Sequence, residues 1–162
     1  MKRLTALLLA PIFLLSLAAC GTKTPASGAL TVTDMTGRQI KFDKPAERIV
    51  ALTAADCEIL YALGAGSTVA GRGEYCDYPE EVLSVPSVQS GPDTNIEQIV
   101  ALKPDAVIMS TMAQTEEQIA SLENAGVKVI VTNAKNIEDV YTAITLIGSV
   151  VEIGRASCRE RV

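Results

Sequence analysis

The stretch Asn95-Ile96-Glu97-Gln98-Ile99-Val100-Ala101-Leu102-Lys103-Pro104-Asp105 decides the fold, because it describes an amphipathic helix, its end and the entry to a buried strand. Thr94 and Glu97 have the spacing of a capping box, in which a hydroxyl and a carboxylate each satisfy a backbone donor at the helix start. Pro104 ends the helix at Lys103, and the apolar run at 106–109 is typical of a fully buried parallel strand. The stretch therefore predicts one helix-and-strand unit of a parallel sheet.

Outward from this stretch, strand-like and helix-like segments alternate. The predicted elements are a hairpin with arms 31–34 and 38–42, strands at 49–52 and 69–70, an irregular stretch at 72–93, a helix at 56–63, a helix at 115–125, a strand at 127–131 and a helix at 137–151. Gly64 and Gly126 are placed to end two of the helices. This alternation predicts an α/β lobe with a central, mostly parallel sheet flanked by helices and preceded by a β-hairpin.

Several of these segments together resemble the N-terminal lobe of the substrate-binding proteins of ABC importers for cobalamin and ferric siderophores. The residues that carry the resemblance are Arg48-Ile49-Val50-Ala51-Leu52, Glu58-Ile59-Leu60-Tyr61-Ala62-Leu63-Gly64, Tyr75-Cys76-Asp77-Tyr78-Pro79, the run from Asn95 to Asp105, and Leu122-Glu123-Asn124-Ala125-Gly126-Val127-Lys128-Val129. They stand in the family's order and spacing. The resemblance implies a helical connection to a second lobe, which would lie outside this chain, with the ligand between the lobes.

The first twenty residues resemble a bacterial lipoprotein signal peptide. Lys2 and Arg3 precede an apolar stretch that ends in Leu17-Ala18-Ala19-Cys20, and the stretch is short for a membrane span. An uncleaved anchor is the alternative. We expect the signal peptide at residues 1–20 to be cleaved so that Cys20 becomes the N-terminus and carries lipid. Residues 21–29 would then form a flexible tether, and residues 30–152 would form the lobe on the outer side of the cell membrane.

The last ten residues, 153–162, break the composition, since they hold three of the chain's seven arginines and continue no apolar period. We interpret them as a translated sequencing adapter, a non-native tail that would leave Cys158 without a biological role. A natural basic tail is the alternative.

The charge balance limits the partners. Between residues 20 and 152 the chain has 9 Lys and Arg against 18 Asp and Glu. This acidic surface disfavours nucleic acid and suits docking on a basic protein surface, which the resemblance identifies with the permease of an ABC importer and its ATPase. The chain has no histidine, which disfavours zinc or manganese import and triad hydrolysis, and no metal site is expected.

Ligands of open α/β sheets bind beyond the carboxyl ends of the strands. This rule and the resemblance select seven ligand-binding candidates: Thr53, Ala54, Asp56, Tyr75, Ser90, Ser110 and Thr111. Tyr75 is the foremost candidate, because an aromatic face with a polar tip can stack on a corrin or a siderophore. The alternatives are a core tyrosine at 75 and helix capping by Thr53 and Asp56.

Two further assignments concern Glu97 and a cysteine pair. The resemblance makes Glu97 the carboxylate that docks on the permease, beside its expected capping role. In an oxidising compartment Cys57 and Cys76 are candidates for a disulfide, and two free buried thiols are the alternative.

The sequence thus predicts a binding protein without catalytic chemistry or a cofactor of its own. It would capture a ferric siderophore or cobalamin and deliver it to the permease. Members of the resembled family that bind cobalamin tend to have tryptophans near the positions of Gly91 and Ser110, so the absence of tryptophan here weighs against cobalamin. A haem-binding lipoprotein of the same import class is one alternative, and a surface enzyme using Cys57 or Cys76 is another.

Overall fold

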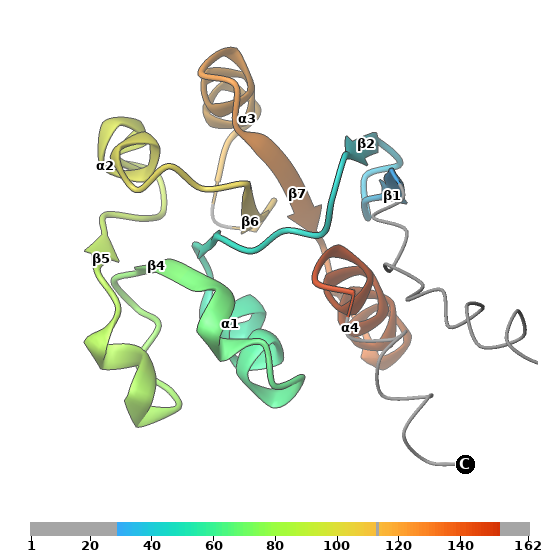
Figure 1. Cartoon of the computed structure of the whole chain (residues 1–162), viewed down its shortest axis with the longest axis horizontal. Coiled ribbons are helices and arrows are strands. Elements are labelled where there is room, and N and C mark those ends of the chain that lie inside the picture. Colours follow the sequence, from blue (N-terminus) through green and yellow to red (C-terminus); the bar gives the residue numbers. More distant parts are fainter. Residues whose placement is uncertain (1–28, 113, 153–162) are drawn as a thin grey trace, which may run out of the picture.

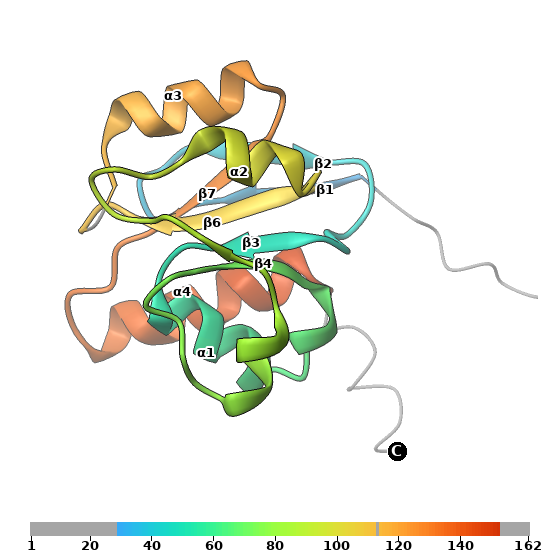
Figure 2. The same cartoon turned by 90° about the vertical axis from the view of Figure 1, so that its left-hand side faces the viewer.

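The computed structural model describes residues 29–112 and 114–152, and these residues form one α/β lobe of three layers. A five-stranded parallel sheet lies between two pairs of helices, with α2 and α3 on one face and α1 and α4 on the other (Figures 1 and 2). The predicted fold class is confirmed. The predicted signal peptide, the tether up to residue 28 and the tail at 153–162 lie outside the described residues.

The elements follow one another in the predicted alternation. They are β1 (Leu30–Thr33), β2 (Gln39–Phe42), β3 (Ile49–Ala51), α1 (Ala54–Ala62), η1 (Gly66–Thr68), β4 (Val69–Gly73), η2 (Glu80–Ser84), β5 (Ser87–Val88), α2 (Ile96–Ala101), β6 (Ala106–Ser110), α3 (Glu116–Asn124), β7 (Lys128–Thr132) and α4 (Ile137–Val150). The strand order in the large sheet is β5-β4-β3-β6-β7, and every pair in it is parallel. None of the described helices has the length and apolarity needed to span a membrane.

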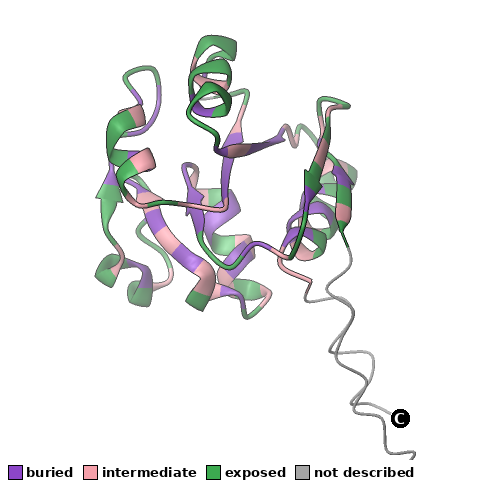
Figure 3. Cartoon of the chain, turned by 45° about the horizontal axis from the view of Figure 1, so that its top comes forward, coloured by how far each residue is buried: buried purple, intermediate pink, exposed green. Residues whose placement is uncertain are grey.

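The core consists of two apolar layers, one on each face of the sheet, because successive side chains of a strand point to opposite faces. In β3, Ile49 and Ala51 pack with the α1 and α4 side chains, whereas Val50 packs with those of α2 and α3. All three are 0% exposed. Figure 3 shows the consequence, with buried residues on the strands and exposed residues on the outer faces of the helices. A central strand buried on both faces explains the continuous apolar run in its sequence.

The hairpin β1–β2 is anchored to β7 by one buried carboxylate. Gly37, in the turn, has φ +87°, a conformation that glycine adopts readily. The side chain of Asp34 is fully buried and accepts hydrogen bonds from Arg38 Nη2 at 2.8 Å and from the Val131 backbone N–H at 3.3 Å. Arg38 also pairs with Glu123 of α3, with Nη1 and Oε1 2.7 Å apart. These contacts fix the hairpin against the edge strand.

The capping box predicted from Thr94 and Glu97 is wrong. Asn95 is the N-cap of α2, and its side chain accepts from the Gln98 N–H at 3.0 Å. Thr94 belongs to the preceding turn, where its hydroxyl donates to the Gly91 carbonyl at 2.6 Å. The helix thus begins one residue later than the Thr94 cap implied, and Glu97 is left as an exposed residue of its first turn.

The end of α2 also differs from the prediction, since the helix stops at Ala101 rather than Lys103. Arg48 accounts for this, because its guanidinium donates to the Leu102 carbonyl at 2.7 Å and the Lys103 carbonyl at 3.3 Å. Lys103 takes φ +50°, which lets the chain turn before Pro104. In this way the carbonyls at the helix end find partners outside the helix.

The stretch at 72–93, predicted to be irregular, contains more regular structure than expected. Strand β4 continues to Gly73, and β5 pairs with it in parallel, with Arg72 opposite Ser87 and Gly73 opposite Val88. The short helix η2 lies between them. The edge strand β5 is therefore an addition to the predicted sheet.

Candidate functional site

The site lies at the carboxyl edge of the sheet, where the direction of the chain connections reverses. Strands β3 and β6 are neighbours, but β3 continues through α1 to β4 on one side, while β6 continues through α3 to β7 on the other. The two crossover helices leave this point on opposite faces of the sheet (Figure 2). Such a reversal leaves a crevice outside the strand ends, which is where open α/β sheets bind ligands.

A groove of about 500 Å³ opens beside this point, between α1 and α4. Hydroxyl and carboxyl groups from three strand ends and one helix start form its polar part: Thr53, Asp56, Ser110 and Thr132. Its apolar part is lined by Ala55, Ile59, Ala62, Met112, Ala134, Val140 and Ala143. A mostly apolar groove with a few convergent polar groups is the usual form of a small-molecule site.

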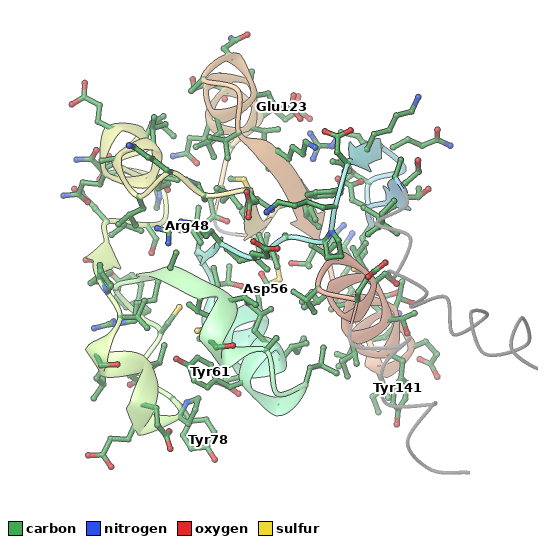
Figure 4. All side chains as sticks on the ribbon, viewed as in Figure 1. Arg48, Asp56, Tyr61, Tyr78, Glu123 and Tyr141 are labelled. Atoms are coloured by element: carbon green, nitrogen blue, oxygen red, sulfur yellow. The ribbon has the colours of Figure 1, made fainter. Side chains whose placement is uncertain are left out.

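Asp56 is the buried polar centre of the groove. It lies in the first turn of α1, is 2% exposed and sits between the helix and the sheet (Figure 4). The hydroxyl of Thr53, the N-cap of α1, donates to Asp56 Oδ2, and Thr132 Oγ1 lies 3.1 Å from the same oxygen. Burial raises the pKa of Asp56, and the two hydroxyl contacts oppose this only in part.

The surroundings of Thr132 suit a protonated Asp56. Thr132 Oγ1 carries one hydrogen but faces two acceptors, Asp56 Oδ2 and the Met109 carbonyl at 3.2 Å. If Asp56 carries a proton, it can donate to Thr132, which then donates to Met109, so that every group is satisfied. Asp56 can therefore be accommodated in the groove wall without a charge, whereas Glu58, which also lines the groove, is exposed.

The seven predicted ligand-binding residues do not all line this groove. Thr53, Asp56 and Ser110 line it, whereas Ala54, Tyr75, Ser90 and Thr111 are absent from its lining. Tyr75 follows β4 and is 74% exposed, and Met112 follows β6 and is 79% exposed, so both stand free at the carboxyl edge. The core alternative for Tyr75 is thus excluded. Ser90 is 6% exposed and Thr111 is exposed.

Sequence reasoning missed Thr132, which ends β7 at the same edge, because the rule that ligands bind beyond the carboxyl ends of strands was applied to the first three strands only.

Sequence reasoning also missed Gln114, which is 7% exposed. The side-chain oxygen of Gln114 accepts from the Ser110 N–H at 2.9 Å, so this amide holds the loop after β6 in place. Its Nε2 is buried without a hydrogen-bond partner. No pattern in the sequence distinguishes it from other polar loop residues.

The predicted disulfide is absent from the structure. Cys57, in α1, and Cys76, after β4, are buried free thiols, each 0% exposed.

Within the described residues there is no cluster of three or more His, Cys, Asp or Glu side chains that could hold a metal ion.

Comparison with known proteins agrees with this geometry. Residues 49–156 match the family described as periplasmic binding protein. The chain is 34% identical over 122 residues to the ABC transporter substrate-binding lipoprotein YvrC of Bacillus subtilis, which covers 74% of this chain and 38% of the relative. It is 36% identical over 99 residues to the vitamin B12-binding protein of Salmonella paratyphi A, covering 61% of this chain and 36% of the relative.

Solved structures with the same fold include two binding proteins. The vitamin B12-binding protein BtuF of Vibrio cholerae superposes with a TM-score of 0.63 at 29% identity, covering 72% of this chain and 47% of that one. A haem-binding protein of Pseudomonas aeruginosa superposes with a TM-score of 0.62 at 25% identity, covering 72% and 44%.

The chain belongs to the periplasmic binding protein family. Its relatives include an ABC transporter substrate-binding lipoprotein, and the chain spans a little over a third of the length of the curated relatives it matches.

Proposed function

We propose that this chain supplies one lobe of an extracytoplasmic solute-binding protein that captures a chelated metal complex, a ferric siderophore or cobalamin, for an ABC importer. The observation that carries the proposal is the groove at the carboxyl edge, where Thr53, Asp56, Ser110 and Thr132 converge among apolar side chains. The exposed Tyr75 and Met112 at the same edge supply apolar surface for a large ligand. Family membership and the similarity to a vitamin B12-binding protein support this ligand class.

Haem is the second candidate ligand. The similarity to a haem-binding protein of Pseudomonas aeruginosa favours it, as does the chemistry of Tyr75, since a phenolate oxygen is one of the protein ligands of haem iron. The chain has no histidine that could serve instead. Binding to iron through Tyr75 would appear as a change in the absorption spectrum of haem.

We further propose that the protein carries out no chemistry on its ligand. Neither Cys57 nor Cys76 lines the groove that carries the proposal, so no thiol faces the ligand there. When the protein is denatured and the released ligand is analysed by mass, we expect the ligand to be unchanged. A modified ligand would contradict the proposal.

Titration of the intact chain with three probes tests the ligand class. Haem, cyanocobalamin and the ferric siderophore ferrichrome are each added while absorbance and heat of binding are followed. We expect one probe to bind, and Tyr75→Ala to weaken it about tenfold, the loss expected for one stacked aromatic ring. Tyr141→Ala is the matched control, because Tyr141 is 67% exposed on the outer side of α4 (Figure 4). Equal losses in both variants, or no binding of any probe, would refute the proposal.

Delivery requires a permease and its ATPase, and we propose Glu97 as the docking carboxylate of this lobe. It is exposed on α2, so it is free to meet a basic surface. Rim charges act mainly on the rate of encounter. Glu97→Gln should slow association with membranes that hold the cognate permease, more so at low salt, whereas the exposed Glu80→Gln should not. Equal association rates for both variants would exclude this role.

We propose that lipid on Cys20 anchors the protein to the outer side of the cell membrane. Cys20 lies outside the described residues. The expected result is incorporation of labelled palmitate into the intact chain and its loss in Cys20→Ser, and labelling that persists in this variant would contradict the anchor.

A further inference from the structure

A second group of reactive side chains lies next to the carboxyl edge, on the α1 side of the sheet. It consists of Cys57, Cys76 and Arg72. Helix α1 lies against β4 (Figure 2), which brings Cys57 of the helix to Cys76 at the end of the turn that follows the strand. Both thiols belong to the same buried cluster, and each shifts the pKa of the other. The ligand groove does not include them.

Cys76 is held by the tight turn that presents Tyr75. The Cys76 N–H donates to the Gly73 carbonyl at 3.0 Å, and the guanidinium of Arg72 donates to the Cys76 carbonyl at 3.0 Å. The Cys76 thiol lies 3.7 Å from the carbonyl oxygen of Ala51 in β3. Residues 74, 75 and 77 around it are exposed, so the sulfur is covered by its own turn and by α1.

Arg72 lies beside Cys76, and its charge lowers the pKa of both thiols. Its Nε–H is buried without a hydrogen-bond partner, although burying such a donor unsatisfied is costly. The hydrogen bond from Cys57 lowers the pKa of Cys76, and the charge of Arg72 lowers it further. The same hydrogen bond and burial raise the pKa of Cys57. The two cysteines are therefore unequal, and Cys76 is the one that ionises first.

We propose that Cys57 and Cys76 are a redox pair whose disulfide ties the turn carrying Tyr75 to helix α1. The structure shows the reduced form. The oxidant is a small or protein disulfide of the extracytoplasmic space. When the exposed turn opens, the Cys76 thiolate attacks one sulfur of that disulfide and releases the first thiolate. Cys57, after losing its proton, then attacks the sulfur of Cys76 and releases the second thiolate.

The balance is complete, since two cysteine thiols become one disulfide while the oxidant disulfide becomes two thiols. The order of attack follows from the site, because opening the turn uncovers Cys76 while Cys57 stays within α1. The bond replaces the hydrogen bond between the thiols, so that the turn presenting Tyr75 gains a covalent tether. Of the proposed function, this inference uses only the extracytoplasmic location and not the ligand.

The test uses the intact chain with Cys20→Ser and Cys158→Ser, which leaves Cys57 and Cys76 as its only cysteines. The folded protein is incubated with oxidised glutathione, and peptides are mapped without reduction. We expect a peptide pair joined through Cys57 and Cys76, and a rise of roughly 10 °C in the midpoint of thermal unfolding relative to the reduced sample. Hydrogen exchange should slow in residues 74–77 on oxidation.

Two single variants test the order of attack. In Cys57→Ser the remaining Cys76 should retain glutathione as a mixed disulfide, whereas in Cys76→Ser the remaining Cys57 should react at least tenfold more slowly. Circular dichroism of both variants confirms that each is folded. Two freely alkylated thiols after oxidation and unfolding would overturn the proposal, and so would faster glutathione capture by Cys57. Ligand titration is not part of this readout, so the proposed function can fail without affecting it.

Discussion

Replacing glycine by alanine should destabilise the protein at Gly73, where β3 and β4 approach closely, and stabilise it at Gly148 in α4. A Cβ at Gly73 would lie 2.5 Å from the Leu52 carbonyl oxygen and 2.9 Å from Ser90 Oγ, although Cβ contacts under 3.0 Å are essentially never found. The nearest atom belongs to the backbone, so it cannot swing aside. Gly73→Ala must therefore push the ends of the two strands apart.

The expected cost is that of overpacking, about 1–3 kcal/mol in the free energy of unfolding. At Gly148, within α4, an added Cβ would meet only Leu63 Cδ1, at an ordinary 3.7 Å. Gly148→Ala should therefore stabilise the protein by about 0.5–1 kcal/mol, because alanine favours the helix and restricts the unfolded chain. Both variants change one hydrogen to a methyl group, which makes them a matched pair.

Urea unfolding followed by circular dichroism at 222 nm, a standard helix signal, measures both changes. The urea midpoint should fall by about 1–2 M in Gly73→Ala and rise by about 0.5 M in Gly148→Ala. The urea midpoint of Gly66→Ala should lie between those of the other two variants. Its added Cβ would meet the Tyr61 ring at 2.6 Å, but this half-buried side chain can move. A midpoint for Gly73→Ala equal to that of the unchanged protein would refute the reasoning.

Two buried carboxyl groups should give opposite pH dependences. Burial raises the pKa of Asp34, but hydrogen bonds from Thr36 and Arg38 outweigh burial and leave the pKa lowered. The stabilisation by Asp34 is therefore present above the unfolded-state pKa and is lost as the pH falls through the folded-state pKa. Arg38→Ala should cost about 2 kcal/mol at pH 7 and less below about pH 4, whereas Lys44→Ala, which breaks an exposed pair, should change nothing. Asp56 has a raised pKa, so its stabilisation is present below the unfolded-state pKa and is lost as the pH rises through the folded-state value. Asp56→Asn should therefore raise the unfolding midpoint at pH 7 and have less effect at pH 4.

Thermal unfolding at both pH values measures these differences. A cost of Arg38→Ala that does not depend on pH would show that the charge of Asp34 is not what Arg38 stabilises. A loss of stability in Asp56→Asn that is larger at pH 7 than at pH 4 would show that Asp56 is ionised in the folded protein and that its charge is needed.

The sheet and its helices could be predicted because their signals are local and mutually consistent. Apolar runs at 49–52 and 106–109 are long enough to mark buried strands, and Gly64 and Gly126 mark helix ends through backbone chemistry that acts within one turn. Both glycines have a positive φ as expected, whereas Thr115, expected as the first residue of its helix, is the N-cap of α3 and forms a capping box with Gln118.

The start of α2 could not be predicted because the sequence offers two capping residues in succession. Thr94 and Asn95 are both good N-caps, and Glu97 and Gln98 each stand three residues beyond one of them. The choice depends on the preceding turn, where Gly91 has φ +90° and its carbonyl accepts the Thr94 hydroxyl. The Gln98 side chain is then free to accept from the Gln89 N–H at 3.1 Å. A tertiary turn thus decides between two equal local signals.

Strand β5 escaped prediction for a different reason, since a strand of two residues has no periodicity to recognise. It exists because Arg72 and Gly73 of β4 offer an unpaired edge. The polar part of the groove was found only in part for a similar reason. The rule that ligands bind beyond the carboxyl ends of strands locates the strand ends, but the order of the strands in the sheet decides which ends lie close together. Thr132 contacts Asp56 only because β7 lies on the far side of β6.

The first turn of α1 connects the two halves of this edge. Thr53 caps the helix, and Asp56 and Cys57 follow in adjacent positions, which a helix separates by about 100°. Asp56 therefore faces Thr132 at the end of β7, while Cys57 faces Cys76 after β4, on the opposite side of the central strand β3. When Asp56 is ionised, its charge raises the pKa of both thiols, so the two groups also sense one another. A change in the cysteine pair acts on the same helical turn that positions Thr53 and Asp56 in the groove, which is why one turn of sequence can serve both the ligand edge and the redox pair.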